Sequence, residues 1–210
     1  MTVKLEKKPA IVGFEFTKEN HKLAKESIAR YPSGRQASAV IDLLYLAQEQ
    51  NNNWLPKENL DYVADYLDMP RIRVYEVASF YTMFNLAPVG KHHLQICGTT
   101  PCWLRGSDEI FATCEKKLGI KKGETTADGM FTIAEVECLG ACANAPMMQI
   151  NNKDFFEDLT PGNIEQLLDD LASGKKVKVG SQIGRTCSAA IDDKAPRKAT
   201  PAKKKTPTNP

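Results

Sequence analysis

Two closely spaced pairs of cysteines constrain this chain more than any other feature of its sequence. Four residues separate Cys97 from Cys102, three separate Cys138 from Cys142, and 35 residues lie between the two pairs. Each pair brings two sulfur atoms close together within one short loop, so four thiolates can converge on one soft metal centre. The fold must therefore bring two separate loops to the same place.

The cysteine spacing leaves the kind of metal centre open. Thiolates select zinc, copper(I) or iron–sulfur clusters. Paired zinc ligands are usually separated by two residues and sometimes by up to four, and both gaps here are wider than two. Four thiolates would give a closed structural site with zinc, or they would hold a 2Fe-2S or 4Fe-4S cluster. The sequence has no C-x-x-C motif and no signal-peptide core, so neither a dithiol redox motif nor persistent disulfides are expected.

Charge is divided unevenly along the 210 residues. From Lys194 to the end there are six basic residues and no acidic ones, which leaves 22 basic against 26 acidic residues before that point, a net charge of −4. The Lys/Pro/Ala-rich composition of residues 184–210 predicts a disordered tail. This tail has no interleaved aromatic residue, so we do not expect it to bind nucleic acid. No apolar run approaches the ~18 residues that span a bilayer.

Helical periodicity dominates residues 17–88, after a segment 1–16 that is expected to be extended. We predict four short helices: one over 17–31 capped by Thr17, one from Ser33 to the Asn run at 51–53, one that begins at Pro56, and one over about 71–84. The fourth helix is expected to bury a set of apolar residues: Val74, Val77, Phe80, Tyr81 and Phe84. These helices predict a small antiparallel bundle.

The pattern changes to strands and helices over residues 89–183. Strands are predicted at 92–97, 134–138, 147–150 and 155–158, with a turn at Asp128-Gly129, a helix from Ser107 to the Gly119 stop, and a last helix over 161–173 capped by Thr160. The fold class is therefore α+β: a helical bundle followed by an α/β domain. Both cysteine pairs begin at the carboxyl ends of predicted strands, where open α/β sheets commonly place their sites.

The residues around the cysteines also fit a thiolate site. Gly98 and Gly140 allow unusual backbone angles and close approach, and Thr99 offers a hydroxyl donor. We expect an apolar wall that limits water to be supplied by Pro101, Trp103, Leu104, Pro146 and Met147. A fifth cysteine, Cys114, falls on the apolar face of a predicted helix and is interpreted as a buried, inert thiol, whereas Cys187 at the edge of the tail is expected to be a free thiol.

Long stretches of the sequence resemble a known family. EVASFYTMFNLAPVGKHHLQICGTTPCWLRGSDEI and LGIKKGETTADGMFTIAEVECLGACANAPMMQIN, with YPSGRQASAVIDLLYLAQEQ and DFFEDLTP, are similar to the 24-kDa (E) subunit family of respiratory NADH:quinone oxidoreductase, complex I. The resemblance covers roughly residues 15–185. It implies a thioredoxin-like ferredoxin domain preceded by a helical domain, and one 2Fe-2S cluster on Cys97, Cys102, Cys138 and Cys142.

The resemblance also implies partners and a role. The chain would be an electron-transfer subunit of the enzyme, taking electrons from FMN in a flavoprotein subunit that also binds NADH. It would lie with other peripheral-arm subunits on the cytoplasmic face of a bacterial inner membrane. A location in the mitochondrial matrix is less expected. It would touch the membrane only through the complex. The chain has no G-x-G-x-x-G motif after a strand, so no NADH or FMN site of its own is expected. Two alternatives stay open: a diaphorase subunit of an NAD-linked hydrogenase or formate dehydrogenase, and a structural zinc-binding scaffold. Ser181, where the family often has proline, is expected to alter only the local path of the tail.

Overall fold

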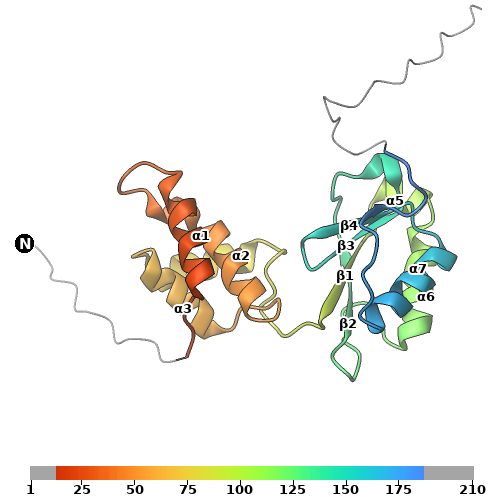
Figure 1. Cartoon of the computed structure of the whole chain (residues 1–210), viewed down its shortest axis with the longest axis horizontal. Coiled ribbons are helices and arrows are strands. Elements are labelled where there is room, and N and C mark those ends of the chain that lie inside the picture. The colour runs from red at the N-terminus through yellow and green to blue at the C-terminus, as the bar shows by residue number, and fades with distance from the viewer. Residues whose placement is uncertain (1–12, 187–210) are drawn as a thin grey trace, which may run out of the picture.

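The protein has a helical part and a sheet part that lie beside each other (Figure 1). The computed structural model describes residues 13–186, so the predicted disorder of the basic tail and the character of Cys187 lie outside the described residues. The α+β fold class is confirmed: seven α-helices and a five-stranded sheet occur within residues 13–186. In that part of the chain no helix is both long enough and apolar enough to cross a bilayer.

The helical part contains four α-helices and one 3₁₀ turn, namely α1 (Lys18–Ala29), η1 (Gln36–Ala39), α2 (Val40–Gln50), α3 (Lys57–Tyr66) and α4 (Arg71–Phe80). The predicted cap is present, since the Thr17 hydroxyl accepts a hydrogen bond from the Asn20 N–H at 3.2 Å. The second helix begins later than the prediction. Gly34 takes a φ of +79°, which a right-handed helix does not accommodate, so the chain turns there before η1 and α2 begin.

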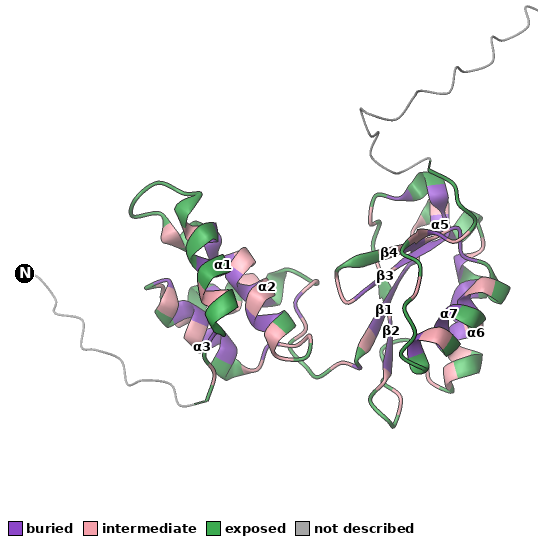
Figure 2. Ribbon diagram, in the orientation of Figure 1, coloured by how far each residue is buried: buried purple, intermediate pink, exposed green. Residues whose placement is uncertain are grey.

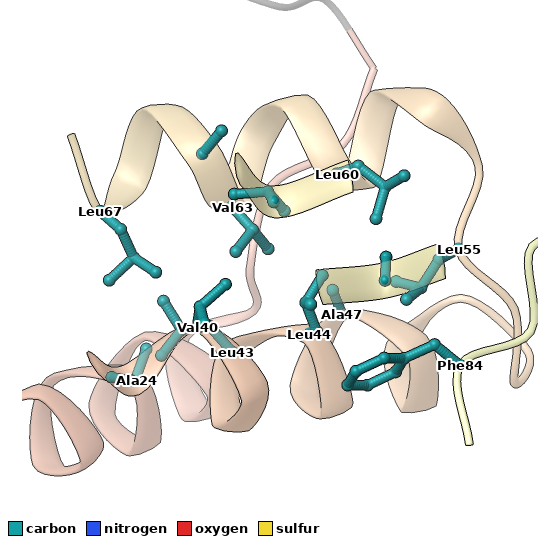
Figure 3. Close-up of a cluster of buried hydrophobic side chains, with 14 of the residues drawn as sticks. Ala24, Val40, Leu43, Leu44, Ala47, Leu55, Leu60, Val63, Leu67 and Phe84 are labelled. Carbon is teal, nitrogen blue, oxygen red and sulfur yellow. The ribbon is translucent and has the colours of Figure 1, made fainter. Parts of the chain in front are cut away.

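The helices enclose their own hydrophobic core (Figure 3). Leu43 and Leu44 from α2 and Val63 from α3 are completely buried in it. The fourth helix buries Val74 and Ala78, but the prediction that it also buries Phe80 is wrong, because 77% of that side chain is exposed. Phe80 follows Ala78 by two residues, roughly 200° around a helix of 3.6 residues per turn, and so points to solvent. Tyr81, also predicted to be buried, is 38% exposed beyond the end of the helix.

The sheet is mixed and has the strand order β2-β1-β3-β4-β5. Its strands are β1 (His92–Cys97), β2 (Phe131–Val136), β3 (Met147–Ile150), β4 (Asp154–Glu157) and β5 (Gly180–Ser181). The central strand β1 is parallel to β2 and antiparallel to β3, β3 and β4 form a hairpin, and β5 is parallel to β4.

Helices α6 (Ser107–Leu118) and α7 (Pro161–Ala172) pack against each other beside the sheet (Figure 1). The second hydrophobic core lies between these helices and the strands; the purple positions of the ribbons in Figure 2 mark the buried residues. Its fully buried members include Leu94, Ile96, Ile110, Ile133, Phe156 and Ile164. The Thr160 cap of α7 is confirmed and extends to a capping box, in which the Asn163 side chain accepts from the Thr160 N–H at 2.7 Å.

Elements of the sheet part also differ from the sequence-based expectation. Strand β2 ends at Val136, so Cys138 lies two residues beyond the strand and not at its last position. Helix α5 (Thr100–Leu104) occupies what was predicted as a loop, and the two-residue strand β5 was not predicted.

The two parts of the protein meet at the turn between β3 and β4. The Asn152 side-chain amide donates to the Met83 carbonyl at 2.9 Å, and the same carbonyl accepts from the Gln48 amide at 3.1 Å. Lys153 forms an ion pair with Glu49 of α2 at 3.7 Å. Both contacts join the helical part to the sheet through the same short turn.

Candidate metal centre

Two parallel strands direct both cysteine loops to the same end of the sheet. Cys97 is the last residue of β1 and is paired in register with Val136, the last residue of β2. Cys138 follows two residues later. Because parallel strands end at the same edge of a sheet, the first cysteine of each loop leaves the sheet at neighbouring positions.

The first loop places its two thiols in the protein interior. Cys97 and Cys102 are each only 1% exposed. The Thr99 hydroxyl lies 3.2 Å from the Cys97 sulfur, as expected of a donor near a thiolate. Helix α5 follows directly, and its first turn carries Cys102 inward.

The same helix turns its last residues to solvent. Trp103 is 55% and Leu104 is 70% exposed, whereas Met147 of the expected apolar wall is 1% exposed and packs with Cys97 and Cys102. The sequence could not show this because the loop was not predicted to be helical, and a helix fixes which of its successive side chains face inward.

The second loop holds its two thiols close together at the surface. Cys138 and Cys142 are exposed, and their sulfur atoms lie 3.3 Å apart. Gly140 takes a φ of +87° between them, a value that favours glycine. Its backbone N–H bonds to Cys138, and this bond, with further bonds from Cys142 and Thr99, holds the pKa of Cys138 below its ordinary value.

The two loops interact with each other. Ala141, which precedes Cys142, packs in one apolar cluster with Cys97 and Cys102, together with Ala145 and Met147. Burial, followed by a hydrogen bond with Cys97, raises the pKa of Cys102 to about 12, and the charge of Cys142 adds to this rise. A thiolate at Cys102 therefore needs a nearby positive charge, which a bound metal supplies.

These four thiols form two pairs and do not surround one point. Within residues 13–186, no group of three or more His, Cys, Asp or Glu side chains is placed to hold a single metal ion. The donor set itself, four soft sulfur ligands, suits an iron–sulfur cluster. Gly98, next to Cys97, leaves room for the Glu135 side chain, because a Cβ at this position would collide with the Glu135 carboxylate.

The fifth described cysteine does not belong to this site. Cys114 lies on α6, is completely buried in the second hydrophobic core, and has its pKa raised to about 12 by burial. The predicted burial of Cys114 is confirmed, and its raised pKa accords with the expected inertness, because thiolate is the reactive form of cysteine.

A polar group behind the second loop was missed by the sequence analysis. Arg185 donates from Nη2 to the Ala143 carbonyl at 2.9 Å and also bonds to Asp158. The Ser181 hydroxyl donates to Asp158 at 2.6 Å. The expectation that Ser181 alters only the local path of the tail is therefore wrong. Arg185 lies 42 residues from Ala143 along the chain, so no local pattern signals this contact.

The arrangement defines a class of protein: a thioredoxin-like domain with cysteine loops at one end of its sheet. The chain belongs to the family of thioredoxin-like [2Fe-2S] ferredoxins, whose sequence model matches residues 24–172. Membership confirms the predicted cofactor, one 2Fe-2S cluster, over the structural zinc alternative.

Curated relatives agree with this assignment. The chain is 56% identical over 161 residues to the E subunit of NADH-quinone oxidoreductase from Rickettsia bellii, covering 77% of this chain and 96% of that protein. It is 51% identical over 172 residues to "NADH dehydrogenase [ubiquinone] flavoprotein 2, mitochondrial" of Dictyostelium discoideum, covering 82% of this chain and 69% of that protein. The predicted resemblance to the 24-kDa (E) subunit family of complex I is confirmed.

A solved structure shares the fold. An NAD+-reducing [NiFe]-hydrogenase in the air-oxidized state matches with a TM-score of 0.54 at 21% identity, over 62% of this chain and 23% of that chain. At this identity the match concerns the fold alone.

Proposed function

We propose that Cys97, Cys102, Cys138 and Cys142 together hold one 2Fe-2S cluster, and that the chain is an electron-transfer subunit of NADH:quinone oxidoreductase. The observation that carries this proposal is the parallel pairing of β1 and β2, which brings both cysteine loops to one end of the sheet. The identity to the Rickettsia bellii protein, which extends over 96% of that relative, supports the particular complex.

The residues of the two loops would have different roles in such a site. A bound 2Fe-2S cluster supplies one-electron chemistry. Buried Cys97 and Cys102 keep water from one side of it, and exposed Cys138 and Cys142 bring the other side to the surface. The Gly140 N–H and the Thr99 hydroxyl bond to sulfur and stabilise its negative charge.

The proposed electron donor is FMN in a flavoprotein subunit, which would also bind NADH. That subunit and others of the peripheral arm are the proposed partners, and the complex would place the chain at the cytoplasmic face of a bacterial inner membrane. We further propose that residues 17–88 and 89–183 are separate domains, a division that limited proteolysis between them would test.

Iron and sulfide analysis of the anaerobically purified chain, with EPR after dithionite reduction, tests the cluster. We expect two irons and two sulfides per chain and a rhombic signal, and we expect loss of this signal in Cys97→Ala and Cys138→Ala. The matched control is Cys114→Ala, which removes a buried thiol outside the site and should keep the cluster. A colourless preparation with stoichiometric zinc would refute the proposal.

A second candidate is a diaphorase subunit of an NAD-linked hydrogenase or formate dehydrogenase. An NAD+-reducing [NiFe]-hydrogenase, which is an enzyme of this kind, has a chain that shares the fold. Purification of the native complex separates the two: NADH-dependent quinone reduction supports the first function, and hydrogen- or formate-dependent NAD+ reduction supports the second.

A further inference from the structure

We propose that Arg185 is a positioning residue for the cluster. It holds the loop of Cys138 and Cys142 in its ligating shape, and Asp158 and Ser181 hold its guanidinium in place. This inference rests on the proposed cluster site but concerns residues outside the four thiols.

The contact of Arg185 is made next to a proposed ligand. Its Nη2 donates to the carbonyl of Ala143, which directly follows Cys142. Both residues belong to η2 (Cys142–Asn144), a single 3₁₀ turn. One turn of this kind has few internal hydrogen bonds and is weak in isolation, so its position depends on contacts from outside.

The guanidinium is fixed by a buried carboxylate. Oδ1 of Asp158 accepts hydrogen bonds from Nε of Arg185, at 2.9 Å, and from Nη2. Oδ2 of Asp158 accepts from the Ser181 hydroxyl at 2.6 Å, and only 4% of the Asp158 side chain is exposed. Two donors of one planar guanidinium on one carboxylate define its orientation, so the third contact, to Ala143, is directional.

The backbone around Arg185 is tied to the sheet. Ser181 of β5 is paired with Glu157 of β4, and the Gln182 N–H donates to the Glu157 carbonyl at 3.0 Å. The Arg185 N–H then donates to the Ser181 hydroxyl at 2.9 Å. In Figure 1 the segment after α7 (blue) returns toward the end of the domain where α5 lies. Arg185 thus connects the sheet to the cysteine loop.

A second set of hydrogen bonds also joins the cysteine loop to the end of β4. Asn144 is 1% exposed, and its side-chain amide donates to the Glu157 carboxylate at 2.6 Å. Its backbone carbonyl accepts from the Asp158 N–H at 2.8 Å. The two residues after Cys142 are therefore both held from outside the loop, Ala143 by Arg185 and Asn144 by Glu157 and Asp158. A loop held in this way keeps its N–H groups oriented toward the sulfur atoms, and such bonds tune the reduction potential of an iron–sulfur centre.

The test compares holoprotein variants purified anaerobically. In Arg185→Gln we expect cluster release to a chelator roughly tenfold faster than in the unmodified protein, since losing a residue that orients metal ligands typically costs 10–100-fold in metal affinity. We also expect altered g-values, a shifted reduction potential, and faster amide exchange over residues 139–145. Ser181→Ala should show a smaller change. The matched control is Arg73→Gln, which removes an exposed arginine paired with Glu76 at 2.8 Å and should behave as the unmodified protein does.

The outcomes are distinguishable. If the unmodified chain binds a cluster and Arg185→Gln keeps its release rate, g-values and potential, the positioning role is refuted. If the unmodified chain binds no cluster, the proposed function fails, and unchanged amide exchange over 139–145 in the variant would refute the positioning role separately. If Arg185→Gln does not fold, Arg185→Lys replaces it, because lysine keeps the charge but not the planar contact, and an unmodified release rate in that variant overturns the inference.

Discussion

The buried His93 should make the stability of the protein fall as the pH falls. Only 6% of this residue is exposed, and its Nδ1 atom is buried with no hydrogen-bond partner among the described residues. Burial lowers the pKa of His93 to about 4, from an ordinary value of 6.5. The folded protein therefore keeps the imidazole neutral at a pH at which the unfolded chain already binds a proton.

The size of the effect follows from that difference in pKa. The pKa of His93 is lower in the folded state than in the unfolded chain. The contribution of neutral His93 to the free energy of unfolding is therefore fully present above pH 6.5 and is lost as the pH falls toward 4. The whole difference corresponds to roughly 3 kcal/mol, of which about 2 kcal/mol is lost between about pH 7 and pH 5. The cause is desolvation alone, so a residue of similar shape that does not titrate should remove the dependence.

NMR titration of the oxidised protein and of His93→Phe measures this directly. The His93 Cε1–H resonance is identified by its absence from the variant, and we expect it to show no titration above about pH 5. The midpoint of thermal unfolding should fall less between about pH 7 and pH 5 in His93→Phe than in the unmodified protein. A His93 resonance that titrates near its ordinary pKa, or equal falls in the midpoint, would refute the reasoning.

Three substitutions test other parts of the fold by their effect on the free energy of unfolding, measured by denaturant titration. Phe156→Ala removes a ring that is 1% exposed and should cost about 3–5 kcal/mol; a loss under about 1 kcal/mol would contradict its place in the core. Thr160→Ala removes the capping box of α7 and should cost about 1 kcal/mol, with reduced helicity by circular dichroism. Gly90→Ala places a Cβ 2.7 Å from the Phe131 carbonyl carbon and should cost roughly 1–3 kcal/mol; unchanged stability would show that the backbone relaxes freely there.

Elements whose ends are marked by nearby residues were predicted from the sequence. Helix α7 starts where Thr160 and Pro161 indicate, and β1 spans His92–Cys97 as predicted. The four thiols were recognisable from residue type and spacing, because soft ligands in close pairs restrict the kinds of site. Cys114 was separable from them by its helical periodicity.

Elements that depend on distant contacts were not predictable. The two-residue strand β5 exists through its pairing with β4, and two residues give no periodic pattern to detect. The contact of Arg185 with Ala143 joins segments 42 residues apart. Phe80 shows the converse: its apolar side chain suggested burial, but helix geometry directs it to solvent. Such a residue is explained only once the helix end and its packing partners are known.

The different burial of the two cysteine pairs follows from the strand order. Strand β1 lies between β2 and β3, so the loop after it has neighbouring segments on both sides, and Cys97 and Cys102 are buried. Strand β2 is at the edge of the sheet, so the loop after it has a neighbouring strand on one side only, and Cys138 and Cys142 are exposed. A loop in that position needs support from elsewhere, and the chain supplies it by returning after α7. The position of β2 at the edge of the sheet therefore has two consequences. It exposes the loop, which would let a partner approach the cluster, and it makes an anchor such as Arg185 necessary.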